Sequence, residues 1–239
     1  MNDLRARLIV ALDYPDLASA LDLAERIASQ VGLLKVGLEL FNSAGPRAIE
    51  SLRALGARVF YDSKFYDIPN TVAGAAAAAG RMGVSMLNVH ALGGRAMMQA
   101  AKEAALRGAQ EAGFPAPLVI AVTIVTSLGD RELRHELGFP STTQEVVLRL
   151  ASVAREAGLD GVVASVREVP EIKRVCGKEF LTVTPGIRPA WAASDDQTRV
   201  ASPKAALAAG SDYLVIGRPI TRADNPGQAL AKILREMAE

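Results

Sequence analysis

The sequence predicts an α/β protein built as a single (β/α)8 barrel of the TIM type, occupying residues 1–239. Short apolar runs alternate with amphipathic or alanine-rich stretches along the whole chain. Strict alternation of strand and helix implies a parallel sheet. The chain has 239 residues, close to the ~250 that one such barrel typically takes.

Eight segments are predicted as strands. Each is a run of mainly apolar residues with little alternation, as is typical of strands buried on both faces. They are Leu8–Leu12, Leu33–Val36, Arg58–Tyr61, Met86–Val89, Leu118–Val122, Gly161–Ala164, Leu181–Val183 and Tyr213–Ile216.

Eight segments between and after these strands are predicted as helices. Pro46 and Pro226 stand in a first turn, and Gly158 and Gly210 follow a last one, which are ordinary helix start and stop signals. The alanine run 75–79 indicates a tightly packed helix. The helices are Leu17–Gln30, Pro46–Leu55, Thr71–Met82, Ala96–Ala112, Thr142–Ala157, Val169–Val175, Pro203–Ala209 and Pro226–Met237.

An open, doubly wound sheet is the alternative to a closed barrel. That fold predicts a glycine-rich phosphate turn after the first strand. Here the first strand is followed by Asp13-Tyr14-Pro15-Asp16, and no GxGxxG or Walker motif occurs. The closed barrel is therefore favoured.

The composition excludes several classes of protein. Lys and Arg total 27 against 26 Asp and Glu, so neither a nucleic-acid partner nor a membrane surface is expected. A single cysteine, Cys176, excludes an intramolecular disulfide and suits a reducing compartment; it is expected to pack in the core. We find no signal peptide and no run long enough to span a bilayer. A cytoplasmic protein is the expectation.

Polar residues gather where the predicted strands end, which is where the chemistry of such barrels lies. Two lysines and three carboxylates converge on one rim: Asp13, Lys35, Asp62, Lys64 and Asp67. Burying several charges together costs several kcal/mol unless they pair, so such a cluster suggests function. Hydroxyl groups at Thr126 and Ser127 follow the fifth strand.

The segment from Asp62 to Thr71, DSKFYDIPNT, is the densest signal. In extended geometry Asp62 and Lys64 point to the same side, which gives a carboxylate and an ammonium on one face. Asp67 is not expected to reach that spot within its own chain, because Pro69 redirects the backbone. The structural alternative is a strand-end salt bridge followed by a turn into the next helix.

A second signal follows the last two strands, where barrels frequently bind phosphate. Pro185-Gly-Ile-Arg188 and Ile216-Gly-Arg218-Pro each supply a glycine and an arginine. Glycine lets backbone N–H groups approach an oxyanion, and arginine adds a forked cationic donor. The polar loop 188–200 is predicted to close over a ligand, with an ordinary surface loop as the alternative.

Other chemistries find little support. The two histidines show no HxxxH or HExxH spacing, so no metal site is expected. No GxSxG motif occurs that would indicate a hydrolase. His90 is interpreted as a hydrogen-bonded structural residue near the rim, and His135 as a solvated one.

These motifs resemble those of the orotidine 5′-phosphate decarboxylase family. The resemblance starts from Asp62-x-Lys64-x-x-Asp67-Ile-Pro-Asn-Thr71 and extends over nearly the whole chain. It includes Ala-Leu-Asp13, Lys35-Val-Gly, Val89-His90-Ala, Thr126-Ser127, Pro185-Gly-Ile-Arg188, Asp196-Gln197-x-Arg199 and Gly217-Arg218-Pro-Ile. The family more often has Leu and His at the positions of Ser63 and Tyr66, and neither position carries a charge role.

The resemblance implies a set of residue roles. Lys64 would donate a proton to C6 of the pyrimidine, with Asp62 and Lys35 beside it and Asp67 supplied by the neighbouring subunit of a homodimer. The remaining substrate contacts would come from Asp13 and Lys35 at the ribose, Ile68 and Thr71 from the partner chain, Thr126 at the pyrimidine edge, and Arg188, Gln197, Gly217 and Arg218 at the 5′-phosphate.

The resemblance also implies the reaction: orotidine 5′-phosphate would lose CO₂ to give uridine 5′-phosphate, in pyrimidine biosynthesis, without a cofactor or metal. Two alternatives stay open. One is a related barrel enzyme that binds Mg²⁺ and a sugar-phosphate enediolate, although Lys35 and Lys64 already balance Asp62 and Asp67. The other is a non-catalytic barrel that binds phosphoribosyl ligands, although every charged rim residue is present.

Overall fold

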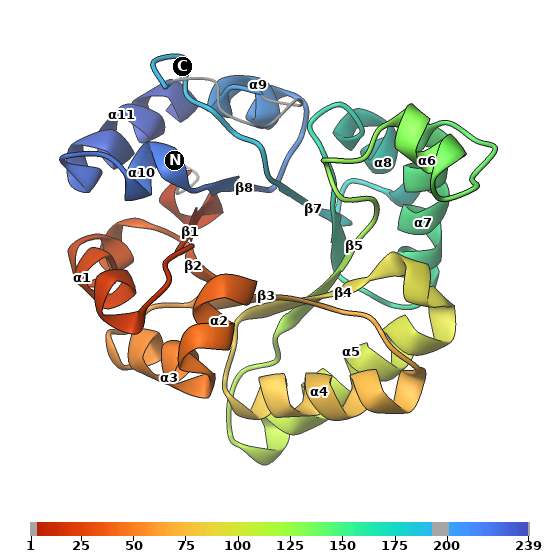
Figure 1. Cartoon of the computed structure of the whole chain (residues 1–239), viewed down its shortest axis with the longest axis horizontal. Helices are drawn as coiled ribbons and strands as arrows, with labels where there is room; N and C mark the ends of the chain where they lie inside the picture. The colour runs from red at the N-terminus through yellow and green to blue at the C-terminus, as the bar shows by residue number, and fades with distance from the viewer. Residues whose placement is uncertain (1–3, 193–200, 239) are drawn as a thin grey trace.

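The computed structural model describes residues 4–192 and 201–238. Eight parallel strands pair in sequence order, and β8 pairs with β1 to close the barrel. Figure 1 looks down this barrel, with the helices forming a ring around the strands. The strands are β1 (Leu8–Ala11), β2 (Leu33–Val36), β3 (Val59–Phe65), β4 (Met86–His90), β5 (Leu118–Val122), β6 (Gly161–Val163), β7 (Leu181–Thr184) and β8 (Tyr213–Ile216).

The strands bury apolar side chains on both faces, as their composition predicts. One layer fills the inside of the barrel and consists of Ile9, Leu33, Phe60, Met86, Ile120 and Val183. A larger layer lies between the strands and the surrounding helices; it includes Leu8, Val10, Leu34, Val59 and Leu87. This double burial holds the strand ends in fixed positions, on which the site depends.

The helices that connect the strands lie close to their predicted positions. Two reciprocal hydrogen bonds fix the N-terminus of helix α7. The hydroxyl of Thr142 accepts from the backbone N–H of Glu145, and the Glu145 carboxylate accepts from the backbone N–H of Thr142. The helices at predicted positions are α1 (Leu17–Ile27), α3 (Pro46–Ala54), α4 (Pro69–Arg81), α5 (Gly94–Glu111), α7 (Thr143–Glu156), α8 (Val169–Cys176), α9 (Pro203–Ala208) and α11 (Pro226–Ala238).

Helices α4 and α5 pack unusually closely, which accounts for the alanine run 75–79. A Cβ at Gly80 would lie 2.3 Å from the carbonyl oxygen of Ala105, and one at Gly108 would lie 2.2 Å from that of Ala77. Only glycine fits these two positions without moving a backbone. The prediction of a tightly packed helix here is confirmed.

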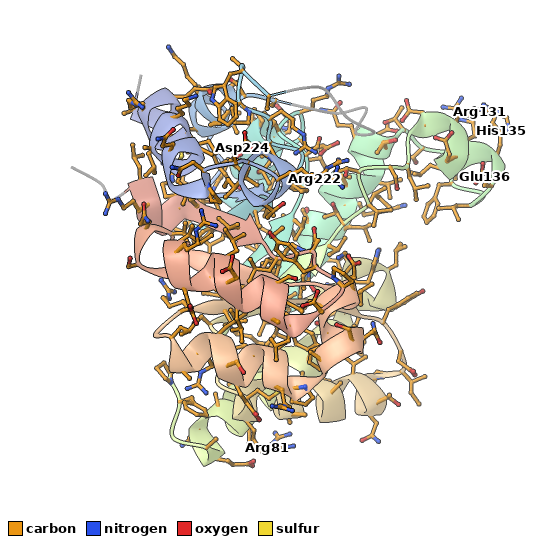
Figure 2. The ribbon with its side chains drawn as sticks, turned by 60° about the vertical axis from the view of Figure 1, so that its left-hand side comes forward. Arg81, Arg131, His135, Glu136, Arg222 and Asp224 are labelled. Atoms are coloured by element: carbon orange, nitrogen blue, oxygen red, sulfur yellow. The ribbon has the colours of Figure 1, made fainter. Side chains whose placement is uncertain are left out.

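Three short helices in the loops after the strands were not predicted. They are α2 (Leu38–Ala44), α6 (Asp130–His135) and α10 (Arg218–Thr221). Figure 2 shows α6, with Arg131, His135 and Glu136, standing out from the body of the barrel. Strand β3 also runs four residues beyond its predicted end, so Asp62 and Lys64 belong to the strand.

Cys176 is buried at the end of α8, as expected for a core residue. Across the described ranges, no helix combines the length and the apolar character needed to cross a membrane.

Candidate active site

A cavity of about 690 Å³ opens at the carboxyl ends of the strands. Its apolar part is formed by side chains that project from inside the barrel, and its polar part by residues at the strand ends. The apolar side chains include Phe60, Val122, Val163, Val183 and Val215. The polar residues that sequence reasoning singled out, and that line the cavity together with Gly186 and Gly217, are Asp13, Lys35, Asp62, Lys64, Thr126, Ser127, Arg188 and Arg218.

Four charged side chains form a continuous chain on one wall of the cavity. Lys35 Nζ lies 3.0 Å from Asp13 Oδ1 and 3.2 Å from Asp62 Oδ2. Lys64 Nζ lies 2.6 Å from Asp62 Oδ1. Positive and negative charges therefore alternate from β1 through β2 to β3. Because the side chains of Lys35 and Asp62 are only 10% and 14% exposed, their mutual pairing is what permits both to be charged.

These neighbours shift the pKa values of the two buried groups. Burial alone would raise the pKa of Asp62, but the charges of Lys35 and Lys64 and the hydrogen bonds it accepts outweigh burial and lower the pKa. Burial alone would lower the pKa of Lys35, but Asp62 and Asp13 outweigh it and raise the pKa. Both shifts favour the ionised forms, so the pair is charged at neutral pH.

Gly37 leaves room for the Lys35–Asp13 pair. A Cβ at this position would come within 2.9 Å of Lys35 Nζ and 3.2 Å of Asp13 Oδ1. A side chain here would displace the ammonium or the carboxylate. The glycine of the Lys35-Val-Gly motif is thereby explained by the geometry of the charged wall.

Lys64 stands on an irregular stretch of β3, and the expectation of extended geometry at this residue was wrong. Its φ is 50°, and within the described ranges it is the sole non-glycine residue with positive φ. The β3–β4 register shifts here, because Tyr61 pairs with Leu87 but Phe65 pairs with Val89. Such a conformation costs about 1–3 kcal/mol at a non-glycine residue. Lys64 and Asp62 nevertheless form an ion pair within this irregular stretch.

Two arginines at the ends of β7 and β8 also line the cavity, and β8 is the strand that pairs with β1. Arg188 follows β7, and Gly217 and Arg218 follow β8. The backbone at the start of the predicted closing loop is fixed: Arg188 N donates to the carbonyl of Ala201 at 2.9 Å, beside a bridge between Ile187 and Ala201. Gln197, expected to contact phosphate, lies outside the described residues.

Three predicted site residues lie outside the cavity lining. Asp67, Ile68 and Thr71 belong to a run of exposed residues, 66–71, on the loop and first turn that lead into α4. Asp67 Oδ1 accepts from the backbone N–H of Ile68, and among the described side chains Lys64 forms its ion pair with Asp62. Within one chain, Asp67 does not join the charged wall.

His90, at the end of β4, differs from its interpretation as a hydrogen-bonded structural histidine. Its Nδ1 is buried and has no hydrogen-bond partner among the described residues. The ring contacts the exposed Tyr66 ring, with centroids 5.7 Å apart. Burial and the nearby charge of Lys64 lower the pKa of His90, so it is neutral at pH 7.

Sequence reasoning missed four polar residues of this site. Three of them line the cavity: Glu39 in the first turn of α2, Thr221 at the end of α10, and Arg222 just after α10, which is labelled in Figure 2. Asn88 lies behind Asp62 and Lys64 and hydrogen-bonds to both. Asn88 had a sequence signal, since it is a polar residue in the middle of a buried strand.

Within residues 4–192 and 201–238, no group of three or more His, Cys, Asp or Glu side chains is arranged to hold a metal ion.

Comparison with known proteins agrees with this geometry. The Orotidine 5′-phosphate decarboxylase / HUMPS family model matches residues 6–233. The chain belongs to this family. The orotidine 5′-phosphate decarboxylase of Moorella thermoacetica is 54% identical over 231 residues, which are 97% of this chain and 92% of that protein. That of Alkalilimnicola ehrlichii is 54% identical over 233 residues, 98% of this chain and 97% of that protein.

A solved structure supports the same family. The crystal structure of orotidine 5′-phosphate decarboxylase from Lactobacillus acidophilus is 39% identical and superposes with a TM-score of 0.86. The match covers 97% of this chain and 99% of that one. The predicted barrel and the family resemblance are both confirmed.

Proposed function

We propose that this chain converts orotidine 5′-phosphate to uridine 5′-phosphate and CO₂, by direct decarboxylation without a cofactor. Membership of the decarboxylase family supports the reaction. The observation that carries the mechanism is the alternating wall of Asp13, Lys35, Asp62 and Lys64, which lines the same cavity as two arginines. This arrangement suits a ligand with a reactive ring at one end and a phosphate at the other.

Lys64 is the proton donor in this proposal. Loss of CO₂ from C6 of the orotate ring leaves a carbanion in the ring plane, where no adjacent carbonyl delocalises it. The site must therefore hold a fixed positive charge at that carbon and then deliver a proton to it. Lys64 meets both needs, since its ammonium reaches into the cavity and is fixed by Asp62 at 2.6 Å.

Asp62 acts on the substrate carboxylate. A carboxylate of the ligand beside Asp62 is a like-charge contact, and the repulsion ends when CO₂ departs. At ~4 Å and an effective dielectric constant of about 20, this repulsion is of order 4 kcal/mol. Enzymes commonly lower barriers by ~8–23 kcal/mol. Stabilisation of the carbanion by Lys64 is therefore the larger contribution.

The ribose and the phosphate occupy the rest of the cavity. Asp13 and Lys35 bind ribose hydroxyls, Thr126 contacts the pyrimidine edge, and Arg188, Gln197, Gly217 and Arg218 bind the phosphate. Arg188 and Arg218 line the cavity at the ends of β7 and β8, which supports this assignment. The phosphate does not react, so its binding energy is available to organise the site and close the loop.

A homodimer completes the site. Asp67, Ile68 and Thr71 are exposed and lie outside the cavity lining of their own chain. Tyr66 and Ile68 are 62% and 66% exposed, and apolar exposure of this size favours burial against another surface. In the proposed dimer, these residues enter the partner's cavity and Asp67 extends the charged wall beyond Lys64.

The test is the loss of the orotate absorbance when purified protein is mixed with orotidine 5′-phosphate, with and without a metal chelator. We expect the absorbance to fall at the same rate in both samples, and uridine 5′-phosphate to accumulate. A Mg²⁺-dependent enediolate enzyme would lose its activity with the chelator. Folded protein that binds uridine 5′-phosphate but leaves the orotate absorbance unchanged would overturn the proposal.

A further inference from the structure

The side chain of Asn88 forms hydrogen bonds with both Asp62 and Lys64, the charged pair at the end of β3. It lies on β4, opposite the irregular stretch of β3, and is fully buried. Its Oδ1 accepts from the backbone N–H of Lys64 at 2.7 Å, and its Nδ2 donates to Asp62 Oδ1 at 2.8 Å. Asp62 Oδ1 is the same oxygen that contacts Lys64 Nζ. One amide therefore contacts the backbone of one charged residue and the carboxylate of the other.

The bulge in β3 explains why an amide is needed here. The register shift takes the N–H of Lys64 out of the regular strand ladder, and a buried N–H requires an acceptor. Asn88 supplies that acceptor and so holds Lys64 at its φ of 50°. Because a backbone N–H can only donate, it fixes which end of the amide faces Lys64. The NH₂ group must then face Asp62.

We propose that Asn88 is a positioning residue for the decarboxylation: it holds the bulge that presents Lys64, and it orients the carboxylate of Asp62 beside the ammonium. The proposal rests on the proposed function of the site. No other side chain of similar size offers one acceptor and one donor in this arrangement. Aspartate offers only acceptors when ionised, and leucine offers neither.

The Asn88→Asp variant is the sharpest test, because it nearly preserves the volume and still accepts from Lys64 N–H. It replaces the donor facing Asp62 with a second carboxylate oxygen, so the two carboxylates repel each other and the pKa of Asp62 rises. We expect kcat to fall at least tenfold at pH 7. The KM should change less than threefold, since the phosphate and ribose contacts are untouched. The acid limb of the kcat–pH profile should move up by at least one pH unit.

Ser63→Ala is the matched control. Ser63 lies in the same bulge and is also buried, and its Oγ donates to the backbone carbonyl of Asn88 at 2.8 Å. The variant removes one hydrogen bond between the same two strands without touching Asp62 or Lys64. We expect it to lower the melting temperature, keep kcat within twofold, and leave the acid limb unmoved.

Two results would overturn the proposal. One is an Asn88→Asp variant that keeps kcat within twofold. The other is an equal loss of kcat in Asn88→Asp and Ser63→Ala with no change in either acid limb, which indicates a purely structural role. If Asn88→Asp does not fold, Asn88→Ser decides: a tenfold fall in kcat at nearly constant KM supports positioning, and an unchanged kcat contradicts it. Lack of activity in the wild-type protein would instead overturn the proposed function.

Discussion

Lys64 combines three properties that no other described residue has together. Its ammonium lines the cavity, it is paired at 2.6 Å with a buried carboxylate, and its backbone adopts a left-handed conformation. Residues held in sparsely populated conformations tend to cluster at active sites, where the surrounding structure imposes them. Here the imposing contacts are the hydrogen bond that Lys64 N–H donates to Asn88 Oδ1 and the ion pair with Asp62.

Replacing Lys64 with alanine should abolish decarboxylation while leaving the fold and nucleotide binding largely intact. The reason is that no other group can both stabilise the C6 carbanion and protonate it. The measurement is kcat for orotidine 5′-phosphate, together with the melting temperature and the affinity for uridine 5′-phosphate. A variant with even a tenth of the wild-type kcat would refute the assignment, since that loss is only ~1.4 kcal/mol.

The Lys35–Asp62 pair should stay charged across the neutral range. The lowered pKa of Asp62 means that its ionised form stabilises the protein above about pH 4, and this stabilisation is lost as the pH falls through the lowered pKa. The raised pKa of Lys35 has the opposite sign: its stabilisation is complete below about pH 10.4 and is lost as the pH rises through the raised pKa. We expect the carboxyl carbon of Asp62 to show no titration step by NMR from about pH 5 to about 9.5. A titration midpoint inside that window would contradict the pairing.

The barrel strands place the site, and all eight could be predicted from the sequence. Mainly apolar runs gave all eight strands, and barrel topology then brought their polar ends to one rim. The short helices α2, α6 and α10, of seven, six and four residues, were not predicted. Helix α9 also has six residues, but Gly210 marks its end in the sequence. Segments of that length carry no clear hydrophobic period.

The candidate site could be predicted in its membership but not in its geometry. Asp13, Lys35, Asp62 and Lys64 follow from strand-end positions. The bulge at Lys64 depends on a contact between β3 and β4, and local sequence holds no information on that register shift. Asn88 was passed over because it lies inside an apolar run, where its amide had no visible partner.

Arg218, the first residue of α10, should act through the phosphate. In the Arg218→Ala variant we expect kcat/KM for orotidine 5′-phosphate to fall between ten- and a hundredfold, since a hydrogen bond to a charged group contributes about 1.5–3 kcal/mol. The slow reaction of orotidine, which lacks the phosphate, should change less than twofold. Equal losses for the two substrates would show that Arg218 serves the chemistry or the fold instead.

The opposite end of the barrel carries a stabilising contact that occurs twice. Asp212, just before β8, accepts from Lys173 Nζ at 2.6 Å and from Thr182 N at 2.7 Å. Asp160, just before β6, accepts from Lys102 Nζ and from Val119 N, both at 2.6 Å. Each carboxylate joins the start of an adjacent strand to a helix.

Asp212→Ala should lower the free energy of unfolding by about 2–4 kcal/mol. The largely buried ammonium of Lys173 loses its carboxylate partner and keeps only backbone carbonyls, and the N–H of Thr182 loses its acceptor. The measurement is urea unfolding, with kcat determined in parallel and expected to stay within twofold. Glu171→Ala is the control, since it removes only an exposed pair with Arg174 and should change stability little. If the two variants unfold at the same urea concentration, the contact at Asp212 is not stabilising.

The whole molecule is proposed to work as a symmetric dimer, in which each cavity receives the 66–71 segment of the other chain. The single domain over residues 1–239 and the cytoplasmic location stay predictions as well. In a shared site, Lys64 of one chain acts together with Asp67 of the other chain. In a self-contained site, both residues act within one chain.

Mixing Lys64→Ala chains with Asp67→Ala chains tests whether the active site is shared between the two subunits. Each variant alone should be inactive, because every site of its homodimer lacks one charge. A mixed dimer has one site with both lesions and one with neither, and random exchange of equal amounts makes about half of the dimers mixed. We therefore predict that decarboxylation returns to roughly a quarter of the wild-type rate. If labelled subunits demonstrably exchange and no activity returns, Asp67 acts within its own chain and the shared site is wrong.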